Sequence, residues 1–256
     1  MKFTILGCGS SMGVPRSDGF FGNCDPRNNK NYRTRCSALL QTKTENILID
    51  TSPDLRTQLL NNKITKIDRV LYSHMHADQT HGINDLRVFF IKRKKTIPVY
   101  SDNATRKYLL NSFSYCFDNN SFEYPAILKL KLIKSKLLIN NGTKSIQIRR
   151  VIVKHGRVNS NCYIINNQLA YISDVSKISK KDFKFFKNLE YLIIDCLWYK
   201  KHPSHLNLDD SLELINILSP KKAILTNLHS DLDYEKLKDI LPKNITPAYD
   251  GLKINL

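Results

Sequence analysis

Three histidines and one aspartate lie within eight residues of one another, at His74, His76, Asp78 and His81. The apolar run 70–72 directly precedes them and predicts a strand. The two-residue step from His74 to His76 places both on one side of an extended segment. The three-residue step from Asp78 to His81 places both on one side of a helical turn. Because imidazole and carboxylate ligands suit zinc, manganese or iron(II), this segment could contribute to two adjacent metal ions.

Three further candidate ligands lie just beyond other apolar runs. His155 follows the run 151–154, Asp174 follows 169–173, and His229 follows 223–228. The ends of strands are where a sheet gathers residues from distant parts of a chain into one site. The four sites, counting the first motif, therefore predict one shared metal centre.

The elements that must position these residues alternate along the whole chain. We expect a strand at 70–73, a helix that begins near Asp78 and runs towards Phe89, and a last strand at 246–249. No linker or repeat divides the 256 residues, which predicts a single domain over 1–256. Strands that precede helices in each half predict two sheets between two helical layers.

These motifs resemble the metallo-β-lactamase superfamily, and the resemblance covers nearly the whole chain. The HxHxD motif of that superfamily matches His74, His76 and Asp78, and its later ligands match His155, Asp174 and His229. An early aspartate that braces the metal loop matches Asp50. The opening Gly7-Cys8-Gly9-Ser10-Ser11 and the ending Ala248-Tyr249-Asp250-Gly251 are similar to its phosphodiesterase branch, which includes a phosphoribosyl cyclic phosphodiesterase and, more distantly, tRNA 3′-endonucleases. The resemblance implies an α+β, four-layer αββα sandwich.

The resemblance also implies a centre with two divalent metal ions, Zn²⁺ or Mn²⁺. His74, His76 and His155 would hold one ion, Asp78 and His229 would help to hold the other, and Asp174 would bridge the two. Such ions lower the pKa of a bound water towards ~7 and neutralise the charge of a phosphoryl transition state. We therefore place Asp78 among the catalytic residues as well as the ligands.

The chain departs from the superfamily at Gln79, where a histidine usually follows the motif aspartate. His81 is the nearest replacement, one helical turn beyond Asp78. Either His81 ligates the second ion or contacts substrate, or it only caps and packs. In the second case the second ion would be weak or absent.

A general acid is expected in the segment His202-Pro203-Ser204-His205, ahead of a helix from Asp209. The phosphodiesterase branch places a histidine near here that protonates the leaving alkoxide, a step suited to an imidazole. His205 is the first choice because it lies nearest to the helix, and His202 is the alternative. A capping loop with incidental histidines is the structural alternative.

The composition narrows the class of protein. No apolar run could span a membrane, and the start of the chain is a strand pattern and not a signal peptide, so we expect a cytoplasmic protein with no membrane contact. Six cysteines without a CxxC pair predict free thiols. The formal net charge of +17 admits an anionic substrate such as a phosphate ester or RNA, although an AT-rich genome also enriches lysine.

Three functions remain open from the sequence. The first is a metal-dependent phosphodiesterase acting on a small cyclic phosphate or nucleotide-like ester, possible as a homodimer. The second is an RNA-processing nuclease, which charge favours but the lack of an evident inserted domain disfavours. The third is a non-catalytic metal-binding protein. Thioester or β-lactam hydrolysis rests on fold analogy alone.

Overall fold

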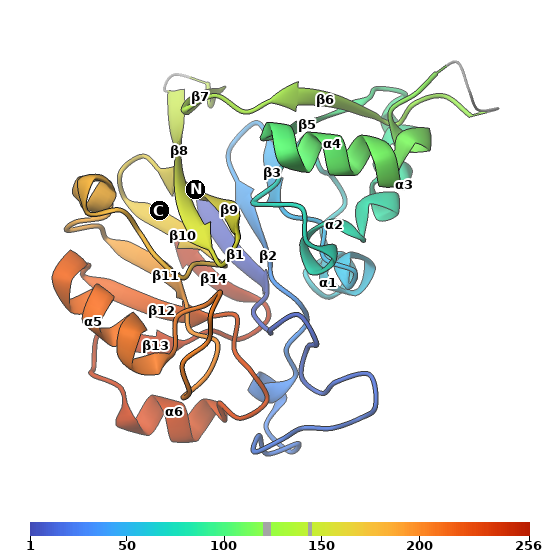
Figure 1. Cartoon of the computed structure of the whole chain (residues 1–256). Helices are drawn as coiled ribbons and strands as arrows, with labels where there is room; N and C mark the ends of the chain where they lie inside the picture. Colours follow the sequence, from blue (N-terminus) through green and yellow to red (C-terminus); the bar gives the residue numbers. More distant parts are fainter. Residues whose placement is uncertain (120–123, 143–144) are drawn as a thin grey trace.

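The strands form two stacked sheets in the computed structural model, which describes residues 1–119, 124–142 and 145–256 (Figure 1). Each sheet has seven strands among the described residues. In spatial order, the first sheet contains β14 (Leu252–Asn255), β1 (Lys2–Gly7), β2 (Ser37–Gln41), β3 (Asn46–Ile49), β4 (Arg69–Leu71), β5 (Ile97–Ser101) and β6 (Leu128–Leu132). The second contains β13 (Ile245–Pro247), β12 (Lys222–Thr226), β11 (Tyr191–Asp195), β10 (Leu169–Ile172), β9 (Val158–Ile165), β8 (Ser145–His155) and β7 (Lys136–Asn140).

Helices cover the outer face of each sheet. The first sheet carries α1 (Leu55–Asn61), α2 (Ala77–Thr80), α3 (Arg87–Arg93) and α4 (Asn103–Ser112) on one side of the molecule, and the second carries α5 (Leu208–Leu218) and α6 (Tyr234–Ile240) on the other (Figure 1). Short 3₁₀ turns lie at Asn29–Asn31, Ile83–Leu86, Ser114–Cys116 and Lys180–Phe185. The predicted α+β, four-layer αββα sandwich is confirmed.

The alternation of side chains along the strands explains the layers. In β3, Ile47 and Ile49 join the core between the sheets, whereas Leu48 faces the helices of the first layer. In β11, Ile193 faces the other sheet, whereas its neighbours Leu192 and Ile194 pack with helical residues of the second layer. Because successive strand residues point to opposite faces, a continuous apolar run serves two cores at once.

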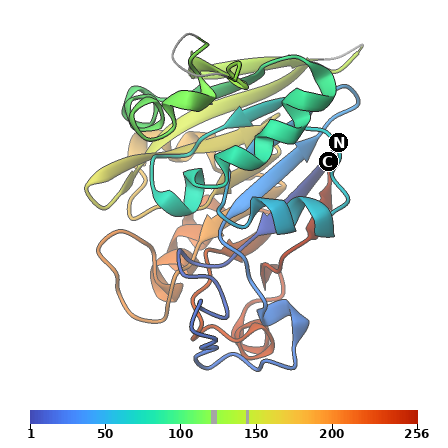
Figure 2. The same cartoon turned by 90° about the vertical axis from the view of Figure 1, so that its right-hand side faces the viewer.

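The ends of the chain meet at one edge of the first sheet, where Figure 2 shows them side by side. The terminal amino group donates to the carbonyl of Leu256 across 3.0 Å. A single last strand at 246–249 was wrong, because β13 is followed by β14, which pairs with β1. The pattern of β14 is weak because only Ile254 in it is buried.

The expected helix from Asp78 to Phe89 is broken. It divides into α2, a 3₁₀ turn and α3. The amide of Thr51 donates to the carbonyl of Gln79, and the amide of Gly82 donates to the carbonyl of Thr51. At Gly82 a Cβ would lie only 2.0 Å from the carbonyl oxygen of Ser52. This close approach to the segment after β3 takes the backbone groups that a continuous helix would need.

Two further expectations concern membrane-spanning segments and the cysteines. In the part of the chain that the structure describes, no helix is both long and apolar enough to cross a bilayer. All six cysteines are free, as their spacing predicts, and all six are buried.

Candidate metal centre

The loop after β4 is held in place by the second sheet. Asn161 of β9 donates from its backbone amide and its side-chain amide to the carbonyl of Ser73, at 2.9 and 2.7 Å. The Tyr163 hydroxyl donates to the carbonyl of Tyr72 at 2.7 Å. From the first sheet, the buried Asp50 accepts the backbone N–H of Ser73 at 2.7 Å. The metal loop is therefore fixed from both sheets immediately before His74.

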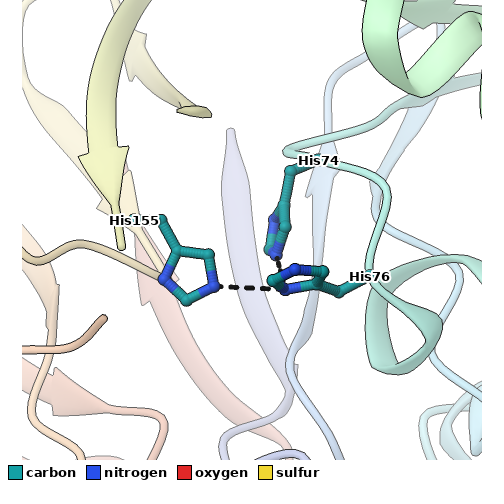
Figure 3. Close-up of side chains that lie close together, drawn as sticks. All are labelled: His74, His76 and His155. Carbon is teal, nitrogen blue, oxygen red and sulfur yellow. Dashed lines mark hydrogen bonds between the residues drawn. The ribbon is translucent and has the colours of Figure 1, made fainter. Parts of the chain in front are cut away.

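Three imidazoles meet at the seam between the sheets, as Figure 3 shows. His76 Nδ1 lies 2.9 Å from His74 Nε2 and 3.2 Å from His155 Nε2. The ring centroids of the three side chains are 4.5 to 5.0 Å apart. A zinc ion with Zn–N bonds of ~2.0–2.1 Å spaces tetrahedral ligands ~3.3 Å apart, so a small opening of this cluster would fit one ion.

The state of these rings suits a cation. His155 Nδ1 donates to the carbonyl of Ser204 at 2.7 Å, which leaves the lone pair of Nε2 directed at the other two rings. Burial lowers the pKa of His74 to about 3, and burial together with the neighbouring His155 lowers the pKa of His76. Neutral imidazoles are the form that ligates metals. The donor set at this position therefore fits a zinc or manganese ion.

Two carboxylates, those of Asp78 and Asp174, form an acidic side of the centre next to the three histidines. Asp174 is buried and forms a second potential ligand group with His155 and His205. Burial raises the pKa of Asp174, but the adjacent imidazoles of His74 and His205 outweigh it and lower that pKa. Burial and the charge of Asp174 raise the pKa of Asp78 to about 6. Gln79 lies between the two carboxylates, with its Nε2 3.1 Å from Asp78 Oδ2 and 3.4 Å from Asp174 Oδ2.

His205 faces the centre from the loop before α5. Its ring centroid lies 4.6 Å from that of His155. Its Nδ1 donates to the buried Asp195 Oδ2 at 2.8 Å. Burial lowers the pKa of His205, but the charge of Asp195 and this hydrogen bond outweigh burial and raise the pKa to about 9. His202 lies in the exposed part of the loop, where its Nδ1 accepts from the hydroxyl of Ser204 at 3.1 Å.

Two predicted ligands lie apart from the three histidines. The His81 ring stacks on Tyr108 and meets Phe113 edge-on, and its Nε2 lies 2.8 Å from the Tyr108 hydroxyl. These contacts agree with the packing alternative for His81.

His229 likewise packs elsewhere. Its ring lies against Trp198, and its Nδ1 lies 3.6 Å from Asp231 Oδ2. Neither His81 nor His229 belongs to a ligand group among the described residues.

Sequence reasoning missed two residues at the centre, Asp195 and Asn227. The Asn227 side chain donates to Asp195 Oδ1 at 3.0 Å and lies 3.0 Å from His205 Nδ1. The signal was present, because Asp195 is the last residue of β11 and Asn227 directly follows β12. The rule that site residues stand at strand ends therefore pointed to Asn227, two positions before the histidine that was chosen.

Comparison with known proteins agrees with the fold. A family model described as a beta-lactamase superfamily domain matches residues 45–227. A curated octanoyltransferase of Porphyromonas gingivalis (strain ATCC BAA-308 / W83) is 31% identical over 257 residues, which cover 99% of this chain and 51% of that protein. The chain thus spans about half the length of that relative.

Solved structures give likenesses over the whole chain. A diphosphatase from the PhnP family is 30% identical with a TM-score of 0.87, covering 100% of this chain and 97% of that one. Zinc-bound PqqB from Methylobacterium extorquens is 14% identical with a TM-score of 0.74 and full coverage of both chains. The short form of human tRNase Z is 17% identical with a TM-score of 0.69, covering 100% and 99%. The last two show the fold alone. Because the family model spans well over half of the chain and the two-sheet architecture agrees with it, this protein belongs to the beta-lactamase superfamily and has the metallo-β-lactamase fold.

Proposed function

We propose that this protein is a metal-dependent phosphodiesterase that cleaves a small cyclic phosphate or a nucleotide-like phosphodiester. The observation that carries the proposal is that two features meet at one site. They are the cluster of three histidines and His205, whose ring is held by the carboxylate of Asp195. The first provides a position for a cation, and the second a proton donor beside it. The likeness to a diphosphatase from the PhnP family, over nearly all of both chains, supports phosphate chemistry over thioester or β-lactam hydrolysis.

The cation would be held by His74, His76 and His155, with Asp174 beside them. When bound, a zinc or manganese ion polarises a phosphoryl oxygen and makes water acidic enough to supply a nucleophile at neutral pH. The chain itself supplies the orientation of the ligands. Ser204 fixes the ring of His155 through its carbonyl, and Ser73 lies with its hydroxyl 2.9 Å from His74 Nδ1. Such contacts to the outer ring nitrogens set the direction of the ligating ones.

His205 is the proposed general acid. The Asp195 carboxylate accepts a hydrogen bond from the Nδ1–H group of His205. Nε2 is therefore the atom that faces the centre and can give a proton to a leaving alkoxide. Asp195 is itself held by the backbone amide of Val175 at 2.9 Å and by Asn227. His205 is therefore oriented by a buried carboxylate, whereas His202 is held only by Ser204 in the exposed part of the loop.

The first test is hydrolysis of bis(p-nitrophenyl) phosphate with added manganese or zinc. Turnover should vanish in His74→Ala, and His205→Ala should be impaired on substrates with alkoxide leaving groups. His202→Ala is the matched control, because it removes an imidazole from the same loop and should retain the rate. Absence of turnover with either metal, on this substrate and on a panel of cyclic phosphates, would contradict the proposal and favour a binding role.

An RNA-processing nuclease is the second candidate, and one observation favours it. A cleft of about 680 Å³ beside β8 is lined in part by Arg150, Lys154, Lys177 and Lys181, in a chain of net charge +17. Such a basic surface suits a polyanion. Gel shifts with a structured RNA across a salt series would decide. Binding that weakens steeply with salt, together with RNA cleavage, would favour the nuclease.

A further inference from the structure

A glutamine side chain lies where the resemblance places a second metal ion. Gln79 is fully buried, and its Nε2 lies within 3.1 and 3.4 Å of carboxylate oxygens of Asp78 and Asp174. These are the two carboxylates that would bind and bridge a second cation. An amide NH₂ group only donates hydrogen bonds and has no lone pair for a metal. In this orientation the NH₂ group offers positive charge density to both carboxylates, as a cation between them would.

The reverse orientation of the amide is disfavoured by the surroundings of its other end. Gln79 Oε1 is buried and has no hydrogen-bond partner within the described residues. Rotation of the amide would put the NH₂ group in that position, without an acceptor, and would turn the oxygen towards the two carboxylates. A metal ion between the carboxylates would remove the repulsion between the rotated amide oxygen and the carboxylates. The NH₂ group would still lack an acceptor. A buried unpaired N–H group is rarer than an under-satisfied carbonyl, so the donor end belongs on the acidic side.

A second amide extends the same pattern. Asn227, which directly follows β12, lies at the centre and donates to Asp195 Oδ1 at 3.0 Å. His229, the residue expected to ligate the second ion, instead packs against Trp198. Two amides at the centre thus each direct an NH₂ group at a carboxylate, Gln79 at Asp78 and Asp174, and Asn227 at Asp195. The NH₂ group of Gln79 has no lone pair to offer a metal, so the position between Asp78 and Asp174 does not fit a second zinc or manganese ion.

We infer that the centre holds one divalent ion, at His74, His76 and His155, and that the Gln79 amide permanently replaces the second. The alternative ligand group of His155, Asp174 and His205 does not add a position, because it shares His155 with the first group. The inference deepens the proposed function and rests on it only in assuming that the three histidines bind a metal. It differs from the two ions that the resemblance implies.

The test is a count of bound metal in the purified holoenzyme, by mass spectrometry after equilibration with manganese or zinc and removal of the free ion. Wild type should hold one ion per chain. Gln79→Glu keeps the size of the side chain but exchanges the NH₂ donor for a carboxylate oxygen, so that three carboxylates meet and the count should rise to two. Gln147→Glu, on β8, adds the same charge away from the acidic side and should leave the count at one.

Electron paramagnetic resonance of the manganese form provides a second readout that does not depend on any variant. One isolated ion gives a six-line signal, whereas two ions that share a ligand give an exchange-coupled spectrum. Two ions in wild type, by either method, would overturn the inference, as would a Gln79→Glu variant that folds and still holds one.

The two proposals fail separately. One ion in wild type without cleavage of any phosphodiester would end the proposed function and leave the count standing. A wild-type protein that binds no ion at saturating metal would overturn both.

Discussion

Replacement of Asp195 by asparagine tests what the negative charge of Asp195 contributes to its pair with His205. Asp195 Oδ2 accepts two hydrogen bonds, from His205 Nδ1 at 2.8 Å and from the amide of Val175 at 2.9 Å, whereas Oδ1 accepts from Asn227 at 3.0 Å. In Asp195→Asn the carboxamide oxygen should stay at the Oδ2 position, since two donors converge there. Its NH₂ group then meets Asn227, whose side chain can rotate and accept. The shape of the pair is kept and its negative charge is lost.

The expected loss follows from the role of His205. General acid catalysis contributes about 10²–10⁴ in rate, or roughly 3–5 kcal/mol of transition-state stabilisation. Without the charge of Asp195, burial disfavours the protonated imidazole, so most of that contribution should disappear for an alkoxide leaving group. A p-nitrophenolate leaving group needs little protonation, so its loss should be much smaller. The bound metal should be unchanged, because Asp195 pairs with His205, whereas the proposed ligands are His74, His76 and His155.

The assay compares kcat of wild type and Asp195→Asn on bis(p-nitrophenyl) phosphate and on a 2′,3′-cyclic nucleotide, with the metal content measured on the same samples. A loss that is much greater for the cyclic nucleotide supports the general acid. Equal losses on both substrates would refute the reasoning, because they would mean that Asp195 acts on something other than the leaving group. Loss of the metal from the variant would refute it as well and would make the pair part of the ligand set.

Three other perturbations have defined outcomes. His74→Ala should lose the bound ion whereas His205→Ala should keep it and lose rate, as metal analysis beside kinetics would show, and loss of the ion from both would contradict the division of roles. Burial raises the pKa of Asp250 to about 6 from the usual 3.8, so the native state holds this proton more tightly than the unfolded state and the stability that Asp250 contributes falls as pH rises between these values. The gap in free energy of unfolding between wild type and Asp250→Asn, from urea titrations, should shrink by about 2 kcal/mol over that range, and a gap that widens with pH would show the opposite sign of shift. Gly82→Ala should lower the free energy of unfolding by about 1–3 kcal/mol, because its Cβ would meet the Ser52 carbonyl at 2.0 Å, and an unchanged urea midpoint would show that the loop yields freely.

Local spacing predicted the part of the site that local structure controls. His74 and His76 share a short extended segment after β4, so their two-residue step was sufficient to bring them together. His155 and Asp174 were found from the ends of apolar strands, and the sheet gathers both. The two-layered fold was equally accessible, because runs such as 47–49 and 192–194 are apolar on both faces.

The remaining differences between expectation and structure come from contacts between distant segments. His81 was placed one turn beyond Asp78 on a helix, but the segment after β3 interrupts that helix through Thr51. His229 was chosen by residue type, whereas the chain turns immediately after β12, with Asn227 at a φ of 61°. That turn directs Asn227 into the site and carries His229 past it. A periodicity argument cannot locate such a turn, since asparagine tolerates this backbone region in many ordinary loops.

The metal position lies on the seam between two halves of the chain. His74 and His76 follow a strand of the first sheet, whereas His155 ends a strand of the second, and the direct link from β6 to β7 spans only residues 133–135. Neither half contains the centre by itself. A chain cut at this link and expressed as two fragments should regain metal binding only when the fragments reassociate. The ion would then serve as a reporter of complementation, and its binding energy would add to the affinity of one half for the other.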